Sequence, residues 1–315
     1  MSDYVIETHG LTRYFGQKCA VDQLDLAVPR GSVFGFLGRN GSGKTTTIRM
    51  LMGLLEPTRG GATVLGYDAT RLPPAARGRI GYMAEGHQVY SWMSVRQAMR
   101  FQQAAFPKWN GKVFWAVADY FSLDRQAKVR DLSRGQRAGL CLALSLAPEP
   151  ELLVWDDPAL GLDPVARRAL LEAMVYVTGK GDRTIFFSSH MLGDVERVAD
   201  RIAILDMAVL RASCSMETFQ AAVRRFVLRF AEAPPQVPAI PGLLEAWRDG
   251  HELRITLTRY GAAAEGVLRG LGAEEMREVA VTLEDAFTSF LAQRGEKSML
   301  FADGRRESRL AGGAV

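Results

Sequence analysis

One short segment constrains this chain more than any other feature of its sequence. Residues 38–45 read Gly-Arg-Asn-Gly-Ser-Gly-Lys-Thr and match the pattern G-x-x-x-x-G-K-[ST]. An apolar run at 33–37 is typical of a buried strand, and residues 46–55 favour a helix. Glycines allow consecutive backbone N–H groups to face one anion, and the helix N-terminus adds the positive end of its dipole. The segment therefore predicts a site for the phosphates of a nucleotide.

Individual side chains of this loop have separate expected roles. Lys44 is expected to reach the β- and γ-phosphates, and the Thr45 hydroxyl to ligate Mg²⁺. The alternative is a chance glycine turn beside a surface lysine, which the flanking strand and helix make the weaker interpretation. The residues expected around the phosphates are Gly38, Asn40, Gly41, Ser42, Gly43, Lys44, Thr45 and Thr46.

Composition indicates a globular protein without a membrane span. The chain has 315 residues, enough for two domains, with 48% hydrophobic and 23% charged residues. Its longest uncharged apolar run, 138–147, is too short to cross a bilayer, and residues 1–10 lack the apolar core of a signal peptide. A cytoplasmic location is therefore expected. The net charge of +4 by itself supports neither a nucleic-acid nor a membrane partner.

The three cysteines show no metal-binding or redox spacing. Cys19, Cys141 and Cys214 form no C-x-x-C pair, and Cys141 lies in an apolar run. We expect buried, reduced thiols rather than a disulfide or a zinc site.

Strands and helices alternate over residues 1–213. Asp163 and Pro164 open one of the helices, as an N-cap followed by proline at the first helical position, and this helix is predicted to reach about residue 178. Several of the strand candidates are continuous apolar runs, which suit a parallel sheet covered on both faces. The expected strands lie at 4–9, 24–28, 32–37, 79–83, 152–155, 184–188 and 201–205.

A helical segment interrupts this alternation. Residues 94–131 have little strand character and many aromatic side chains, most of which we expect in a core. We interpret about 88–135 as a helical subdomain inserted into the sheet domain. The aromatic residues are Phe101, Phe106, Trp109, Phe114, Trp115, Tyr120 and Phe121.

The pattern changes again after residue 213. Residues 214–295 predict a small α+β domain, with strands near 226–230, 253–257 and 277–281 and helices near 262–271 and 283–293. Thr282 is the expected N-cap of the last helix, with Asp285 placed to complete a capping box. Residues 296–315 are rich in Gly, Ser and Arg and predict a poorly ordered tail.

Further motifs follow the glycine loop in a set order. An apolar strand at 153–155 ends in Asp156, residues 132–136 read Leu-Ser-Arg-Gly-Gln, residues 160–164 read Leu-Gly-Leu-Asp-Pro, and His190 ends a strand. Together these motifs resemble the ATP-binding-cassette (ABC) ATPases over residues 1–213. The resemblance implies a P-loop NTPase α/β sheet domain with the inserted helical subdomain.

The resemblance also implies how the motifs cooperate. Two cassettes pack head to tail around two ATP molecules, and in each site one subunit supplies Lys44, Thr45 and Asp156 with the Mg²⁺. The other subunit supplies donors at a helix N-terminus, in the segment Ser133, Arg134, Gly135 and Gln136. His190 faces the γ-phosphate. Phe15, or alternatively Tyr14, stacks on adenine unless it is simply packed in a core.

Three positions depart from the family pattern. Asp157 stands where the family has a glutamate as the base that orients water, and Glu85 stands where it commonly has a glutamine that senses Mg²⁺ and water. Glu85 keeps an oxygen ligand, so it remains in the expected metal set with Thr45 and Asp156. Arg134 replaces a glycine, and two outcomes stay open for it, simple tolerance or a gain in phosphate binding.

Residues 283–287 resemble the tail domain of ATPase subunits of drug- and polymer-type (ABC-2-like) exporters. The first hypothesis is therefore an exporter ATPase, dimeric with itself or with a second ABC subunit, and bound at the cytoplasmic membrane face through a separate permease. The second is a weakly hydrolysing cassette with a regulatory or structural role, because of Asp157. Work on nucleic acid or ribosomes fits less well, because such relatives usually carry two cassettes or long coiled-coil inserts.

Overall fold

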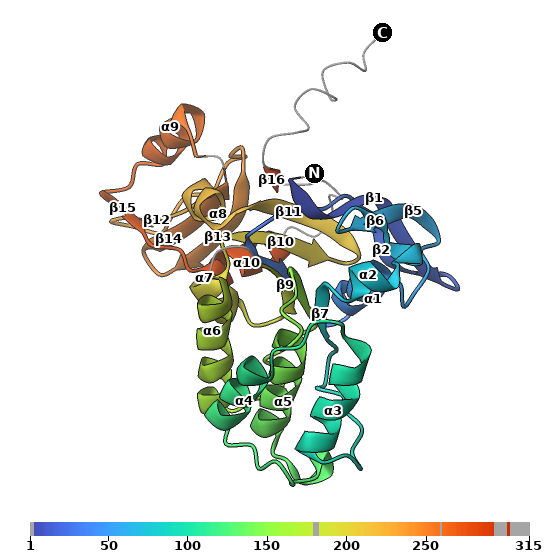
Figure 1. Ribbon diagram of the computed structural model, residues 1–315. Helices are drawn as coiled ribbons and strands as arrows, with labels where there is room; N and C mark the ends of the chain where they lie inside the picture. Colours follow the sequence, from blue (N-terminus) through green and yellow to red (C-terminus); the bar gives the residue numbers. More distant parts are fainter. Residues whose placement is uncertain (1–2, 179–182, 259, 293–300, 303–315) are drawn as a thin grey trace. The chain divides into compact units, whose positions relative to one another are not determined.

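The computed structural model describes residues 3–178, 183–258, 260–292 and 301–302. The chain divides into two units, Met1–Ser213 and Cys214–Val315 (Figure 1). Of the tail predicted for 296–315, only Phe301–Ala302 lie among the described residues, as the short strand β16. No helix in the described part of the chain has the length and apolar character needed to cross a membrane.

A small antiparallel sheet begins the first unit. Its strand order is β2-β1-β5-β6, and β3 also pairs with β1. Register shifts interrupt the pairing of β1 with β2 and with β5, so β1 bends along its length. The strands are β1 (Tyr4–Phe15), β2 (Lys18–Leu24), β3 (Ala27–Pro29), β5 (Arg59–Val64) and β6 (Tyr67–Asp68).

A second sheet forms the centre of this unit. Its order runs β11-β10-β4-β9-β8-β7, and the pairs from β10 to β7 are parallel. Every residue of β4, β8 and β9 is buried, as their apolar sequences predict. The carboxyl ends of the parallel strands therefore meet at one edge. The strands are β4 (Val33–Leu37), β7 (Ile80–Met83), β8 (Leu152–Trp155), β9 (Thr184–Ser189), β10 (Arg201–Asp206) and β11 (Val209–Ser215).

Helices complete the unit, and several of their starts carry the expected caps. Ser94 and Ser133 each accept from a backbone N–H and form capping boxes with Gln97 and Gln136. Asp163 accepts from the first turn of α6, as predicted. The elements are α1 (Lys44–Leu51), η1 (Ala69–Arg71), α2 (Pro74–Arg77), α3 (Val95–Ala105), α4 (Gly111–Tyr120), η2 (Val129–Asp131), α5 (Arg134–Leu146), α6 (Pro164–Thr178) and α7 (Leu192–Val198).

Helices α3 and α4 pack beside α5 around their own apolar cluster (Figure 1). Phe114 is fully buried at its centre, and Trp109, Trp115 and Phe121 pack against it half-buried. The prediction that most aromatics of this segment are core is only partly right. Phe101 and Tyr120 are each more than half exposed, because they occupy the outer faces of their helices.

The second unit is an antiparallel sheet with helices. The strand order is β13-β14-β12-β15, and an apolar core that includes Phe226, Ile255 and Leu268 covers one face. Thr282 caps the last helix by accepting from the Asp285 N–H. The elements are α8 (Met216–Ala222), β12 (Val223–Arg229), β13 (Leu243–Asp249), β14 (Glu252–Thr258), α9 (Ala262–Gly270), β15 (Glu275–Val279) and α10 (Leu283–Ala292).

Some expected boundaries were wrong. The strand predicted at 24–28 falls across the break between β2, which ends at Leu24, and β3, which begins at Ala27, and left-handed Gln23 lies beside that break. The helix predicted at 46–55 ends at Leu51, because Gly53 turns left-handed against the Ala69 carbonyl, where no side chain fits. Strands β5 and β13 were not predicted, since β5 contains paired glycines and β13 is mostly exposed, with no regular alternation of polar and apolar residues.

Candidate functional site

A cavity of about 370 Å³ lies where the first unit's predicted phosphate loop meets the strand ends. The glycine loop and two aspartates, Asp156 and Asp157, line this cavity together. A hollow beside it, about 510 Å³, includes Ser42 and His190. The cavity is lined by Phe15, Lys18, Ala20, Asn40, Gly41, Gly43, Lys44, Thr45, Thr46, Glu85, Asp156, Asp157 and Leu160.

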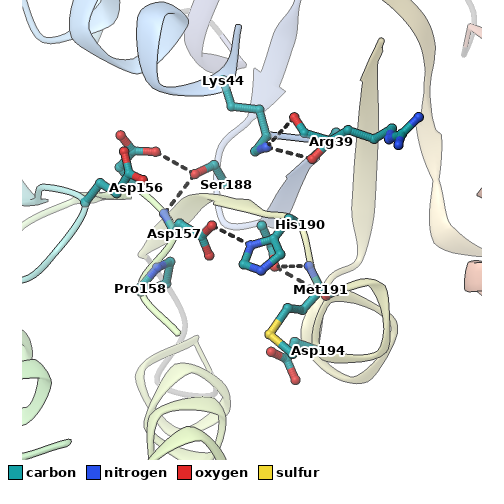
Figure 2. A network of polar contacts seen from close by, with 12 residues as sticks. Arg39, Lys44, Asp156, Asp157, Pro158, Ser188, His190, Met191 and Asp194 are labelled. Carbon is teal, nitrogen blue, oxygen red and sulfur yellow. Dashed lines mark hydrogen bonds and ion pairs between the residues drawn. The ribbon is translucent and has the colours of Figure 1, made fainter. Parts of the chain in front are cut away.

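The glycine loop has the shape that its sequence predicts. Gly41 and Gly43 are left-handed, and a Cβ at Gly43 would overlap the Ala20 carbonyl, so only glycine fits there. Lys44 begins α1, and its Nζ donates to the carbonyls of Gly38 (2.6 Å) and Arg39 (3.2 Å; Figure 2). Burial lowers the Lys44 pKa, and nearby carboxylates oppose that shift. A phosphate would replace these carbonyls as a stronger, charged acceptor.

The oxygen-bearing side chains of Thr45, Asp156 and Glu85 lie close together in the same cavity as Lys44. The Thr45 hydroxyl lies 3.2 Å from Asp156 Oδ1 and 3.3 Å from Glu85 Oε2. Ser188 Oγ donates to the same Asp156 oxygen at 2.7 Å. Asp156 Oδ2 is buried without a hydrogen-bond partner, and burial raises the pKa of this carboxyl group.

These oxygens fit Mg²⁺, which prefers such hard ligands. Among the described residues no group of three or more His, Cys, Asp or Glu side chains is arranged to hold a metal. The protein alone therefore offers an incomplete ligand set at Thr45, Asp156 and Glu85. Phosphate oxygens and water would have to complete it, as is usual for Mg²⁺ at nucleotide sites.

Asp157 and His190 form a direct pair at the cavity wall (Figure 2). His190 Nδ1 lies 2.6 Å from Asp157 Oδ2, and the Asp157 N–H donates to Ser188 Oγ at 2.8 Å. Asp157 is left-handed, with φ 45°, and its Oδ1 is buried without a partner. Burial raises the Asp157 pKa, while the contact with His190 works in the opposite direction. A water molecule in the cavity could satisfy Oδ1 and be oriented by it.

Phe15 is the aromatic side chain at the cavity mouth. It is 49% exposed, so it does not pack in a core, and the Arg13 guanidinium lies 4.7 Å from its ring centre. Tyr14 is 37% exposed and does not line the cavity. Phe15 is therefore the better placed of the two to stack on a base.

The structure does not bring the segment 133–136 into this cavity. Ser133 caps α5, while Arg134 is exposed and its guanidinium lies over the left-handed Gly161. Gly135 is buried, and a Cβ there would press on Ala166. The N-terminus of α5, with its backbone N–H donors, thus faces away from the cavity. It can bind a phosphate group only where another molecule brings that group to it.

Sequence reasoning missed two residues that organise the site. Ser188 contacts both aspartates, and the only sequence signal was a pair of hydroxyl residues ahead of His190 on an otherwise apolar strand. His87 is buried and contacts the Pro158 carbonyl, with no motif to indicate it. Of the cysteines, Cys141 and Cys214 are buried and outside any disulfide, as expected, but Cys19 is only half-buried.

Comparison with known proteins gives a consistent result. Residues 21–160 match the family model described as ABC transporter. The bacitracin transport ATP-binding protein BcrA of Bacillus licheniformis is 33% identical over 203 residues, 64% of this chain and 66% of that protein. The Nod factor export ATP-binding protein I of Bradyrhizobium diazoefficiens is 34% identical over 65% of this chain and 69% of its own length.

Two further matches extend this result. The probable multidrug ABC transporter ATP-binding protein YbhF of Escherichia coli is 35% identical over 69% of this chain, and the match spans only 38% of that longer protein. A solved structure of an ATP binding subunit of an ABC transporter superposes with a TM-score of 0.62 and 27% identity, covering 69% of this chain and 92% of that one.

Proposed function

The chain belongs to the ATP-binding proteins of ABC transporters, and from this premise we propose that it hydrolyses ATP to drive an exporter. The observation that carries the proposal is the cavity that joins Lys44, Asp156 and Asp157, with His190 bound to Asp157 from the adjoining hollow. Relatives named for bacitracin transport and Nod factor export support the exporter branch. The transported substrate would be set by a separate permease.

Each side chain has a definite task in the proposed reaction. Lys44 exchanges the Gly38 and Arg39 carbonyls for phosphate oxygens. Thr45, Asp156 and Glu85 would hold Mg²⁺, which would supply positive charge against the phosphates. Asp157 orients the water that attacks the γ-phosphorus. The water oxygen bonds to that phosphorus as the bond from phosphorus to the ADP oxygen breaks, and ADP, hydrogen phosphate and one proton of the water leave.

His190 supports two groups at once in this scheme. One ring nitrogen holds Asp157 in place, and the other is free to face the γ-phosphate. Phe15 stacks on the adenine at the cavity mouth. The residues that line the cavity and the pattern of the family support these roles.

The outward-facing start of α5 supports a head-to-tail dimer. Ser133 and Gly135 would donate to the γ-phosphate held by the second subunit, and Arg134 carries a guanidinium with no ion pair in the described structure. ATP would then join two surfaces that separate after hydrolysis. The second subunit is another copy or a related ABC protein.

A groove of about 450 Å³ on the helical side supports a permease contact. Exposed aromatic side chains line it, which is typical of a protein–protein contact rather than of a free surface. A cytoplasmic helix of the permease would seat there and hold the ATPase at the membrane. The lining residues are Gln88, Val89, Tyr90, Met93, Ala98, Phe101, Gln102 and Leu144.

Light scattering after size exclusion tests the dimer. Asp157→Asn should slow hydrolysis and trap an ATP-bound dimer, and adding Arg134→Glu should return it to a monomer that still binds ATP. Arg130→Glu is the matched control, because Arg130 is also exposed and changes the same charge outside the α5 N-terminus. A monomer in every sample with saturating Mg·ATP would refute the dimer.

A further inference from the structure

His87 lies in the segment that leaves β7 and runs toward the groove. Its side chain is almost fully buried, with 5% exposure, although the segment is a loop. Gly86 and His87 are both left-handed, at φ 79° and 54°, and this conformation is costly for a residue with a side chain. The surrounding structure therefore holds the His87 ring in the interior even though the left-handed backbone conformation of this residue is unfavourable.

The ring makes one specific hydrogen bond. His87 Nε2 lies 2.8 Å from the carbonyl oxygen of Pro158, the residue after Asp157. Because a carbonyl oxygen only accepts, Nε2 carries the proton and donates.

The neighbours of His87 in the chain connect it to both functional regions. Two residues earlier, Glu85 contacts Thr45 at the phosphate loop. Immediately after His87, residues 88–90 form one wall of the groove, where the Tyr90 ring packs edge-on against Phe101 with centroids 5.8 Å apart. A single buried side chain thus lies between the groove wall and the residue that follows Asp157.

We propose that His87 is a positioning residue that couples the groove to the catalytic carboxylate through the Pro158 carbonyl. A helix seated against residues 88–90 would hold the His87 ring, and the ring would fix the backbone from which Asp157 orients water. Asp157 is left-handed and one carboxylate oxygen lacks a protein partner, so its position depends on such backbone support. The inference rests on the proposed function and adds the residue that transmits the permease contact.

Two variants of equal length separate the hydrogen bond from simple packing. In His87→Gln, the amide nitrogen lies as many bonds from Cα as Nε2 does, and it can donate to Pro158. In His87→Met, a methyl group takes that place without a donor. Both variants meet the same backbone strain, so their urea unfolding midpoints should differ only by the loss of one hydrogen bond in His87→Met.

Steady-state hydrolysis by the full chain gives the first readout. We expect His87→Met to lower kcat about tenfold, the effect of losing one buried hydrogen bond, with KM for ATP changed less than about twofold. His87→Gln should retain most of the wild-type kcat. Equal kcat values for His87→Met and wild type would overturn the inference while leaving the ATPase proposal intact.

Trp92 gives a second readout that does not depend on turnover. It is 60% exposed, its ring lies 6.0 Å from that of Tyr90, and its fluorescence should change when Mg·ATP binds if the two regions are coupled. Subtracting the signal of Trp92→Phe isolates it. The change should persist in His87→Gln and vanish in His87→Met. An unchanged ATP response in His87→Met would overturn the inference even if the wild type proved inactive in hydrolysis.

Discussion

Asp157→Asn should make the nucleotide-free protein more stable while removing its activity. The Asp157 side chain is 9% exposed, and its Oδ1 is buried without a hydrogen-bond partner. Burial raises the pKa of this carboxyl group more than the contact with His190 lowers it. The ionised Asp157 side chain therefore lowers the stability of the folded protein. Active sites commonly carry such a loss because the reaction requires the charge.

The sign of the pH effect follows from this shift. A carboxyl group whose folded-state pKa is raised favours folding below its unfolded-state pKa and loses that contribution as pH rises through the folded-state value. At pH 7 the wild type therefore carries the full cost of the buried charge. Neutralising this carboxylate should raise the free energy of unfolding by about 1 to 3 kcal/mol, because a buried charge without a full set of partners costs more than a neutral amide in the same place.

Urea unfolding without nucleotide, followed at pH 7 and at steps toward pH 4, measures the effect. The difference between Asp157→Asn and wild type should be largest at pH 7 and should shrink as pH falls through the raised pKa. Asp119→Asn, on an exposed position of α4, is the control and should change little. A wild type more stable than Asp157→Asn at pH 7 would refute the reasoning.

Two other predictions concern packing and burial. Gly139→Ala should lower the free energy of unfolding by about 1 to 3 kcal/mol, because its Cβ would overlap the Phe121 ring. Gly193→Ala is the control, because its Cβ meets open space and should leave that free energy unchanged. The midpoints of urea unfolding measure both effects. Burial raises the Cys141 pKa to about 12, so at pH 8 a thiol reagent should label only the half-buried Cys19 in the native protein and all three cysteines after unfolding. Fast native labelling of Cys141 would contradict its burial.

The parallel core was predictable because its strands are short apolar runs with clear ends. The strand at 152–155 has the bounds predicted for it, and Asp156 follows at the sheet edge where the phosphate loop also lies. The glycine pattern predicted the loop because Gly43 leaves no space for a side chain. The local sequence was sufficient to predict the structure wherever only one residue type can adopt the required backbone geometry.

Other features depend on contacts between distant segments, which local patterns do not encode. His87 and Pro158 are 71 residues apart, and neither belongs to a periodic pattern. Strand β13 is held by pairing with β14, although most of its side chains are exposed. The exposure of Phe101 was likewise unpredictable, since an aromatic residue on a helix face is usually core.

The departures from the family pattern also gain a physical context. Glu85 contacts Thr45 and keeps an oxygen in the proposed metal set. Asp157 reaches His190 directly despite its shorter side chain, so the two residues of the proposed catalytic pair are in contact. To orient water as well as a glutamate does, the Asp157 carboxylate must lie within about 1 Å of the position that a glutamate carboxylate would take, because a displacement of that size can change a rate about 10²-fold.

Steady-state phosphate release by the purified protein, measured beside Asp157→Asn and Asp157→Glu, tests the central claim most directly. Hydrolysis by the wild type that is lost in Asp157→Asn is the predicted result, and it would identify Asp157 as the residue that orients water. No release by the wild type, even with its permease present, together with strong gain in Asp157→Glu, would contradict the claim. The cavity would then serve ATP binding alone, beside a more active partner subunit.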